Sequence, residues 1–65
     1  MITFDRNGES GNIFFILGEA IAELKVAGQE NDAKQLYQRV IHSGSYEEAL
    51  EIIAEYVDIV EVEEV

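Results

Sequence analysis

The spacing of hydrophobic and polar positions changes twice along the chain. In "MITFD" apolar and polar residues alternate, with Ile2 and Phe4 on one side, which predicts a strand followed by the turn-rich loop "RNGESG". Between residues 12 and 58 apolar residues recur every three or four positions, which is the helical period. "DIVEVEEV" alternates again, with Val60 and Val62 on one side, and predicts a strand that can pair with the first, either within one chain or between two chains. We therefore expect a mainly α, three-helix domain with a short β-strand at each terminus (β-α-α-α-β).

The first predicted helix extends from Asn12 to Gly28. Asn12 or Ser10 can cap it through a side-chain oxygen, and Gly28 suits the left-handed conformation that follows a last helical turn. At 100° per residue, one broad arc forms the expected core face. Its members are Ile13, Phe14, Leu17, Ala20, Ile21 and Leu24.

A second apolar strip lies nearly opposite this core face. It consists of Phe15, Gly18, Ala22 and Val26, and we call it the apolar strip. Gly in a helix interior costs about 1 kcal/mol relative to Ala, which a close approach of another backbone would offset. Two interpretations remain open: the strip is covered by a strand or helix of the same chain, or it faces a partner or a second copy.

The second and third helices have recognisable starts. The second is expected from Asn31 to Ser43, capped by Asn31 or by Asp32 in a capping box with Gln35. Its predicted buried stripe is Ala33, Leu36, Tyr37, Val40 and Ile41. The third begins at Ser45, with Glu48 as the reciprocal capping residue, and is expected to end between Tyr56 and Asp58. Its predicted core residues are Tyr46, Ala49, Leu50, Ile53 and Val57.

Length and charge restrict the classes of function. The 65 residues make one small acidic domain, residues 1–65, and its hydrophobic fraction of 48% is that of a globular chain. The formal net charge is -10, which disfavours direct binding to nucleic acid or to an anionic membrane and favours a protein partner with a basic surface. No segment resembles a signal peptide or a bilayer-spanning helix, so we expect a cytoplasmic protein.

Acidic residues concentrate in the C-terminal half. If the third helix reaches Asp58, five acids share one face: Glu47, Glu48, Glu51, Glu55 and Asp58. These five form the acidic stripe, with one charge per ~3.3 Å at ~1.5 Å rise per residue. Duplex DNA carries one per ~1.7 Å. The stripe is either a partner-binding surface that imitates a nucleic-acid strand or a solvated helix face that keeps the protein soluble.

Residue patterns for catalysis or for cofactor binding are absent from the sequence. There is no Cys, "NGESG" lacks the Lys and the spacing of a phosphate-binding loop, and "DRNGE" lacks calcium-loop spacing. The single His, His42, falls near the end of the second helix, where the helix dipole favours an imidazolium. We expect no catalytic, cofactor-binding or metal-binding residues, and hence no enzyme.

Two segments together resemble a known group of proteins. They contain Gly11, Asn12, Phe14 and Gly18, and then Gly44, Ser45, Tyr46, Glu47 and Leu50. In this pattern, Gly-Asn-x-Phe followed by Gly-Ser-Tyr-Glu-x-x-Leu, the chain resembles small proteins of bacteriophages and other mobile elements. That resemblance implies no activity or cofactor, but it implies an accessory protein that binds a host protein. We therefore expect a protein-binding module, such as a phage-encoded inhibitor of a host nucleic-acid-binding or defence protein. The alternative is a homo-oligomeric assembly protein, for example a homodimer.

Overall fold

The computed structural model describes residues 1–63 and has the expected β-α-α-α-β order. Strand β1 (Ile2–Phe4) is followed by a short 3-10 turn, η1 (Glu9–Gly11). Three helices come next: α1 (Ile13–Val26), α2 (Glu30–Ile41) and α3 (Tyr46–Ala54). Strand β2 (Ile59–Glu61) follows α3, and residues 64–65, which the second predicted strand included, lie outside the described part. The fold class predicted from the sequence is confirmed.

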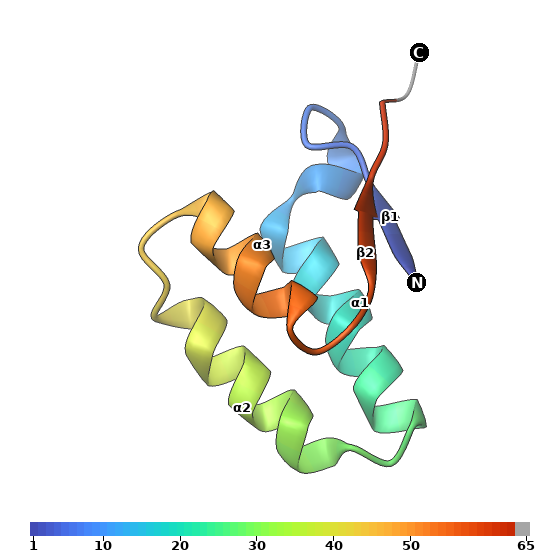
Figure 1. The fold of residues 1–65 in the computed structure, drawn as a ribbon, viewed down its shortest axis with the longest axis vertical. Helices are drawn as coiled ribbons and strands as arrows, with labels where there is room; N and C mark the ends of the chain where they lie inside the picture. The colour runs from blue at the N-terminus through green and yellow to red at the C-terminus, as the bar shows by residue number, and fades with distance from the viewer. Residues whose placement is uncertain (64–65) are drawn as a thin grey trace.

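The two strands pair within the chain and run parallel. Ile2 is opposite Ile59 and Phe4 is opposite Glu61. A parallel pair requires a long crossover connection, which here consists of the three helices (Figure 1). The alternation in β2 suggests that the side with Val60 is the buried one, but Val60 is 42% exposed, while Ile59 is half-buried and packs against the core. The alternating pattern fits either face, and the register with the buried Ile2 selects the face that carries Ile59.

Helix α1 lies between the two-stranded ribbon and α2. Its buried face is therefore shifted around the helix axis from the face that we predicted. Ile16 is almost completely buried, whereas Phe14, which we predicted in the core, is 69% exposed. The reason is that β1 packs along one flank of α1 with Ile2 and Phe4 and so buries the side that carries Ile16. Phe14 lies on the other flank, at the edge of the predicted arc, and remains in solvent.

The N-caps predicted from the sequence are confirmed for α1 and α3 but not for α2. The Asn12 side chain accepts a hydrogen bond from the Phe14 N–H, and Gly28 adopts a φ of 78°, both as predicted. Ser45 caps α3 by accepting from the Glu48 N–H. Helix α2 differs, because it begins at Glu30 after Gln29, which makes no side-chain cap. The box predicted between Asp32 and Gln35 is not the start of this helix.

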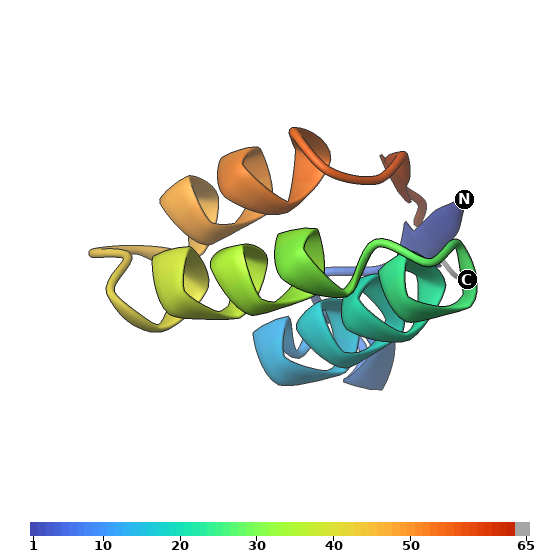
Figure 2. The same ribbon diagram turned by 90° about the horizontal axis from the view of Figure 1, so that it is seen from below.

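The core lies where the three helices and the ribbon meet. Figure 2 shows α3 on one side of the bundle and α1 on the other, with α2 packed against both. The buried hydrophobic residues are Ile2, Phe4, Ile16, Leu17, Ala20, Leu24, Ala33, Leu36, Val40, Ala49, Leu50, Ile52 and Ile53. Two residues of the predicted α2 stripe are not fully buried, because Tyr37 is 46% and Ile41 44% exposed. Tyr37 lies toward the side of α2 that α3 does not cover, and Ile41 lies beside the start of α3.

Candidate functional site

The predicted acidic stripe is shorter than expected. Helix α3 ends at Ala54 with Glu55 as its C-cap, so Asp58 belongs to the connection before β2 and not to the helix. Its backbone carbonyl accepts a hydrogen bond from the Ile2 N–H, which holds the start of β2 against β1. The expectation that α3 reaches Asp58 is therefore wrong, although all five acids of the stripe remain exposed.

Two arginines from outside α3 neutralise part of the stripe. Arg6 binds Glu61 of β2 through its Nε, 2.6 Å from Oε2, and also donates to Glu47. Arg39 of α2 donates hydrogen bonds to both carboxylate oxygens of Glu55, at 2.8 and 3.0 Å. The hydrogen bonds from Arg39 lower the pKa of Glu55 from its usual value. These pairs reduce the net charge along α3, so the stripe has a lower charge density than its five acids alone would give.

Of the other two acids on α3, one makes a side-chain hydrogen bond and the other does not. Glu48 takes part in the cap of α3, because its Oε1 accepts from the Gly44 N–H at 3.1 Å. Glu51 makes no ion pair or side-chain hydrogen bond with any of residues 1–63, and it faces solvent. Substitution of Glu51 therefore changes the charge of the stripe without removing a contact of the fold.

The two segments of the resemblance contact each other. The Tyr46 hydroxyl donates a hydrogen bond of 2.6 Å to the Gly11 carbonyl, and the Arg6 guanidinium lies over the Tyr46 ring, 5.5 Å from its centroid. Partial burial raises the pKa of Tyr46. Gly11 is buried, and a Cβ there would lie 2.2 Å from the Asp5 carbonyl oxygen. These motif residues join the N-terminal loop to α3, which is a structural role.

The apolar strip of α1 is not covered by the described chain. Phe15 is 55% and Val26 90% exposed, and Gly18 and Ala22 between them are exposed too. A Cβ built on Gly18 would meet no atom within 4 Å. Of the two interpretations of the strip, the one in which the chain's own strands or helices cover it is wrong. A role in contacting a partner stays a prediction.

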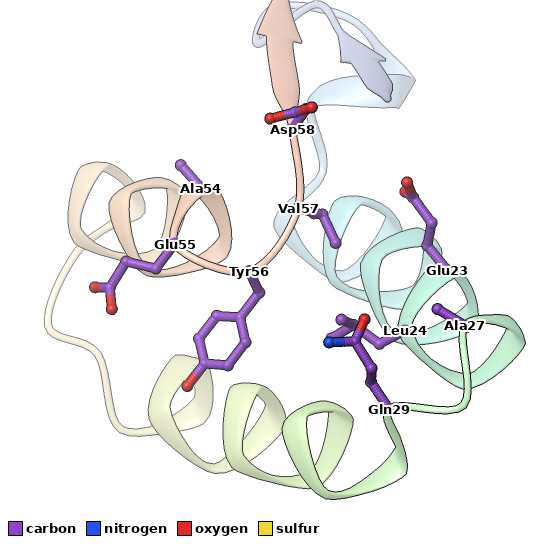
Figure 3. A pocket seen from close by; sticks show the side chains of 9 residues that line it. All are labelled: Glu23, Leu24, Ala27, Gln29, Ala54, Glu55, Tyr56, Val57 and Asp58. Carbon is purple, nitrogen blue, oxygen red and sulfur yellow. The ribbon is translucent and has the colours of Figure 1, made fainter.

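A hollow of about 310 Å³ lies where the C-terminal ends of α1 and α3 approach the start of α2. Figure 3 shows Leu24, Gln29 and Tyr56 around it, and the carboxylate of Glu55 points away from it toward Arg39. Its carboxylates do not converge on one point, and residues 1–63 contain no group of three or more His, Cys, Asp or Glu side chains suited to a metal ion. His42, the C-cap of α2, has its Nδ1 2.7 Å from the Gln38 carbonyl oxygen.

The sequence interpretation missed a further surface, on the side of the α1–α2 pair away from α3. Ile21 and Tyr37 contribute to a groove of about 350 Å³, with Lys25 and Lys34 at the same place. The stripe of α2 is wider than its neighbours can bury, since α3 packs along one side of α2 and no described helix packs along the other. The sequence did contain a signal for this surface, because the predicted apolar stripe of α2 has five members, which is more than two neighbouring helices bury.

Comparisons with known proteins add no relationship. No family model matches the chain, and no match was found among curated proteins or among solved structures. None of the helices described over residues 1–63 is long and apolar enough to cross a membrane.

Proposed function

We propose that this protein is a non-enzymatic binding module that recognises another protein through the apolar strip of α1. The observation that carries the proposal is the exposure of Phe15 and Val26 on a helix whose opposite face forms the core. Apolar patches that a small domain leaves in solvent are typical of interaction sites. The open space over Gly18 lets another backbone approach the helix closely.

The charge of the molecule indicates the kind of partner. A net charge of -10 attracts a basic surface over a long range, and the exposed acids of α3 add to this field. Such steering raises the rate of association more than the final affinity, and salt weakens it. Basic surfaces of this sort occur on proteins that bind nucleic acid. We therefore propose that the partner is a host nucleic-acid-binding or defence protein that this chain inhibits, in keeping with the resemblance to proteins of bacteriophages.

A second candidate function is self-assembly. The same strip would then contact a second copy, and the protein would be a homo-oligomeric assembly component without an inhibitory role. The observation that favours it is again the uncovered strip, because a contact between identical helices needs no further binding surface. The repulsion between two copies of charge -10 opposes this arrangement at low salt.

Affinity capture from a host lysate, at low and at high salt, tests the first candidate. Phe15→Glu places a charge in the strip and should abolish capture of a basic protein. Glu51→Lys should weaken capture at low salt, more than Glu63→Lys, which makes the same charge change outside α3. Undiminished capture by Phe15→Glu would exclude the strip as the contact surface.

Light scattering of the purified protein tests the second candidate. A dimer that persists at high salt and dissociates in Phe15→Glu would favour the assembly role. A monomer at every salt concentration, together with salt-sensitive capture of a basic protein, would favour the binding module. The two variants Phe15→Glu and Glu51→Lys act on separate helices, α1 and α3, so their effects can be told apart.

A further inference from the structure

Helices α1 and α2 form two grooves between them. Helix α3 packs into one, and the other lies on the opposite side of the helix pair. Helix α3 packs against both α1 and α2 from one side (Figure 2). On the other side Ile21 of α1 is half-buried and Tyr37 of α2 is 46% exposed, and both line the 350 Å³ groove. A helix in this groove would contact the same pair of helices that α3 contacts.

The apolar surface continues beyond this groove toward the start of α1. Ile41 lies one turn after Tyr37 on the same side of α2, and Phe14 lies two turns before Ile21 on the same side of α1. Phe14 and Ile41 together line a second hollow of about 400 Å³, which Tyr46 and Ala49 at the start of α3 also border. From Phe14 to Lys25 the surface is roughly 16 Å long at ~1.5 Å per residue, which is about three turns of a docked helix.

One end of the groove has a net positive charge, although the molecule as a whole is strongly negative. Both lysines of the chain, Lys25 and Lys34, line the groove, together with Glu30. Both arginines are held by carboxylates, whereas neither lysine has a carboxylate within ion-pair distance among residues 1–63. This end of the groove therefore offers two unpaired cations beside an apolar surface, in a protein of net charge -10.

We propose that the α1–α2 groove binds an amphipathic helix of a partner protein that carries carboxylates in its first turn. Its apolar residues, at helical spacing, would pack between Ile21 and Tyr37 and then beside Phe14 and Ile41. Its carboxylates would lie over Lys25 and Lys34, which fixes the direction of the helix as antiparallel to α1. Carboxylates in a first turn are also favoured by the docked helix's own dipole. The rest of this helix carries no excess of acids, because the remaining surface of the protein repels them.

Two synthetic peptides of identical composition test this proposal, and the test does not involve the apolar strip. Both are 14-residue helices with leucines at three stripe positions; one carries two glutamates in its first turn and the other carries them in its last turn. We expect the first peptide to bind about tenfold more tightly, since the second places its carboxylates away from the lysines and against its own dipole. Backbone amide shifts in NMR spectra should change at Ile21, Lys25, Lys34 and Tyr37.

Protein variants with equal net charge separate the lysines from the general field. Lys25→Gln with Lys34→Gln changes the net charge from -10 to -12, and so does Ala54→Glu with Val60→Glu at exposed positions outside the groove. The lysine variant should bind the first peptide about fivefold more weakly than the control variant, since exposed ion pairs each contribute a few-fold. Tyr37→Ala should weaken binding, whereas Val26→Ala, a truncation of a 90% exposed side chain on the strip, should not.

Several results would overturn the proposal. They are equal affinity of the two peptides, equal effects of the lysine and control variants, or amide shifts that map to Phe15 and Val26. Absence of binding by either peptide at millimolar concentration would also exclude the groove as a helix-binding site. The capture experiments with Phe15→Glu are independent of the peptide measurements, so the two proposals can fail separately.

Discussion

At the scale of single residues, two glycines seven positions apart have opposite physical roles. Gly11 is buried against the loop after β1, where a Cβ would lie 2.2 Å from the Asp5 carbonyl oxygen and 2.4 Å from the Arg6 Cα. Both contacts are with backbone, which cannot move away as a flexible side chain would. Gly18 lies in the middle of α1 with open space around it. The first glycine is needed for the fold, and the second is not.

Alanine substitutions at these glycines should therefore change stability in opposite directions. Gly11→Ala should lower the free energy of unfolding by about 2 kcal/mol or more, because the chain must shift to admit the methyl group. Gly18→Ala should raise it by roughly 0.5–1 kcal/mol, since Ala is the better helix former. Urea unfolding followed by circular dichroism measures both. A neutral Gly11→Ala would contradict the close packing of the loop against Gly11.

Gly18→Ala also separates stability from function. If a partner approaches the backbone of α1 over Gly18, the added methyl group should weaken capture of that partner while the protein itself becomes more stable. If the strip is not a contact surface, capture should be unchanged. Measuring both quantities on one variant distinguishes these outcomes.

At the scale of elements, the local signals differ in how strongly they determine a helix end. Ser45 and Asn12 each place a side-chain oxygen on a free N–H of the following helix, as their residue types predict. Helix α2 has no such residue at its start, and the Gln29 side chain instead donates to Asp32 at 3.1 Å. Gly28, whose φ is 78°, follows the C-cap of α1 and terminates that helix, and α2 begins two residues later at Glu30.

Removing the cap of α3 should cost more than changing the start of α2. Ser45→Ala loses the bond from the Glu48 N–H and should lower the free energy of unfolding by about 1 kcal/mol. Gln29→Ala, the matched change at the other N-cap, should be nearly neutral because its side chain binds no helix N–H. Thermal unfolding should show a shift of roughly 4–8 °C for Ser45→Ala in a domain of this size. Equal shifts for the two variants would mean that the Ser45 cap does not stabilise the domain.

These elements also show why the sequence predicts the fold better than the surfaces. Periodicity and capping residues are local, so the order of elements could be predicted, whereas the parallel pairing of the two strands within one chain could not. The burial of Ile16 in place of Phe14 depends on which flank of α1 the ribbon covers, which no local pattern specifies. The pairing of Arg6 with Glu47 and Glu61 joins residues 41 and 55 positions apart. For that reason the neutralised part of the acidic stripe could not be predicted from its spacing alone.

At the scale of the whole molecule, a small core is combined with a large net charge. A domain of fewer than about 70 residues without disulfides or metal has a net stability of roughly 3–5 kcal/mol at most. Fourteen acids against four bases repel one another over distances longer than the ion pairs. The ion pairs themselves are exposed, with side-chain exposures from 38% to 63%, so each contributes little. We therefore expect self-repulsion to be the larger electrostatic effect on stability.

Salt should consequently stabilise this protein. Raising NaCl from about 20 mM to about 500 mM shortens the Debye length from roughly 20 Å to about 4 Å and should raise the urea midpoint, because repulsion among the acids is screened. Urea is the suitable denaturant because it is uncharged, whereas guanidinium chloride would itself screen the charges. In Glu51→Gln with Glu63→Gln the net charge falls from -10 to -8 without loss of an ion pair, and the effect of salt should be smaller. A urea midpoint that falls with salt would show instead that the pairs made by Arg6 and Arg39 outweigh the repulsion, and the steering field assigned to the acidic surface would then be weaker than its formal charge implies.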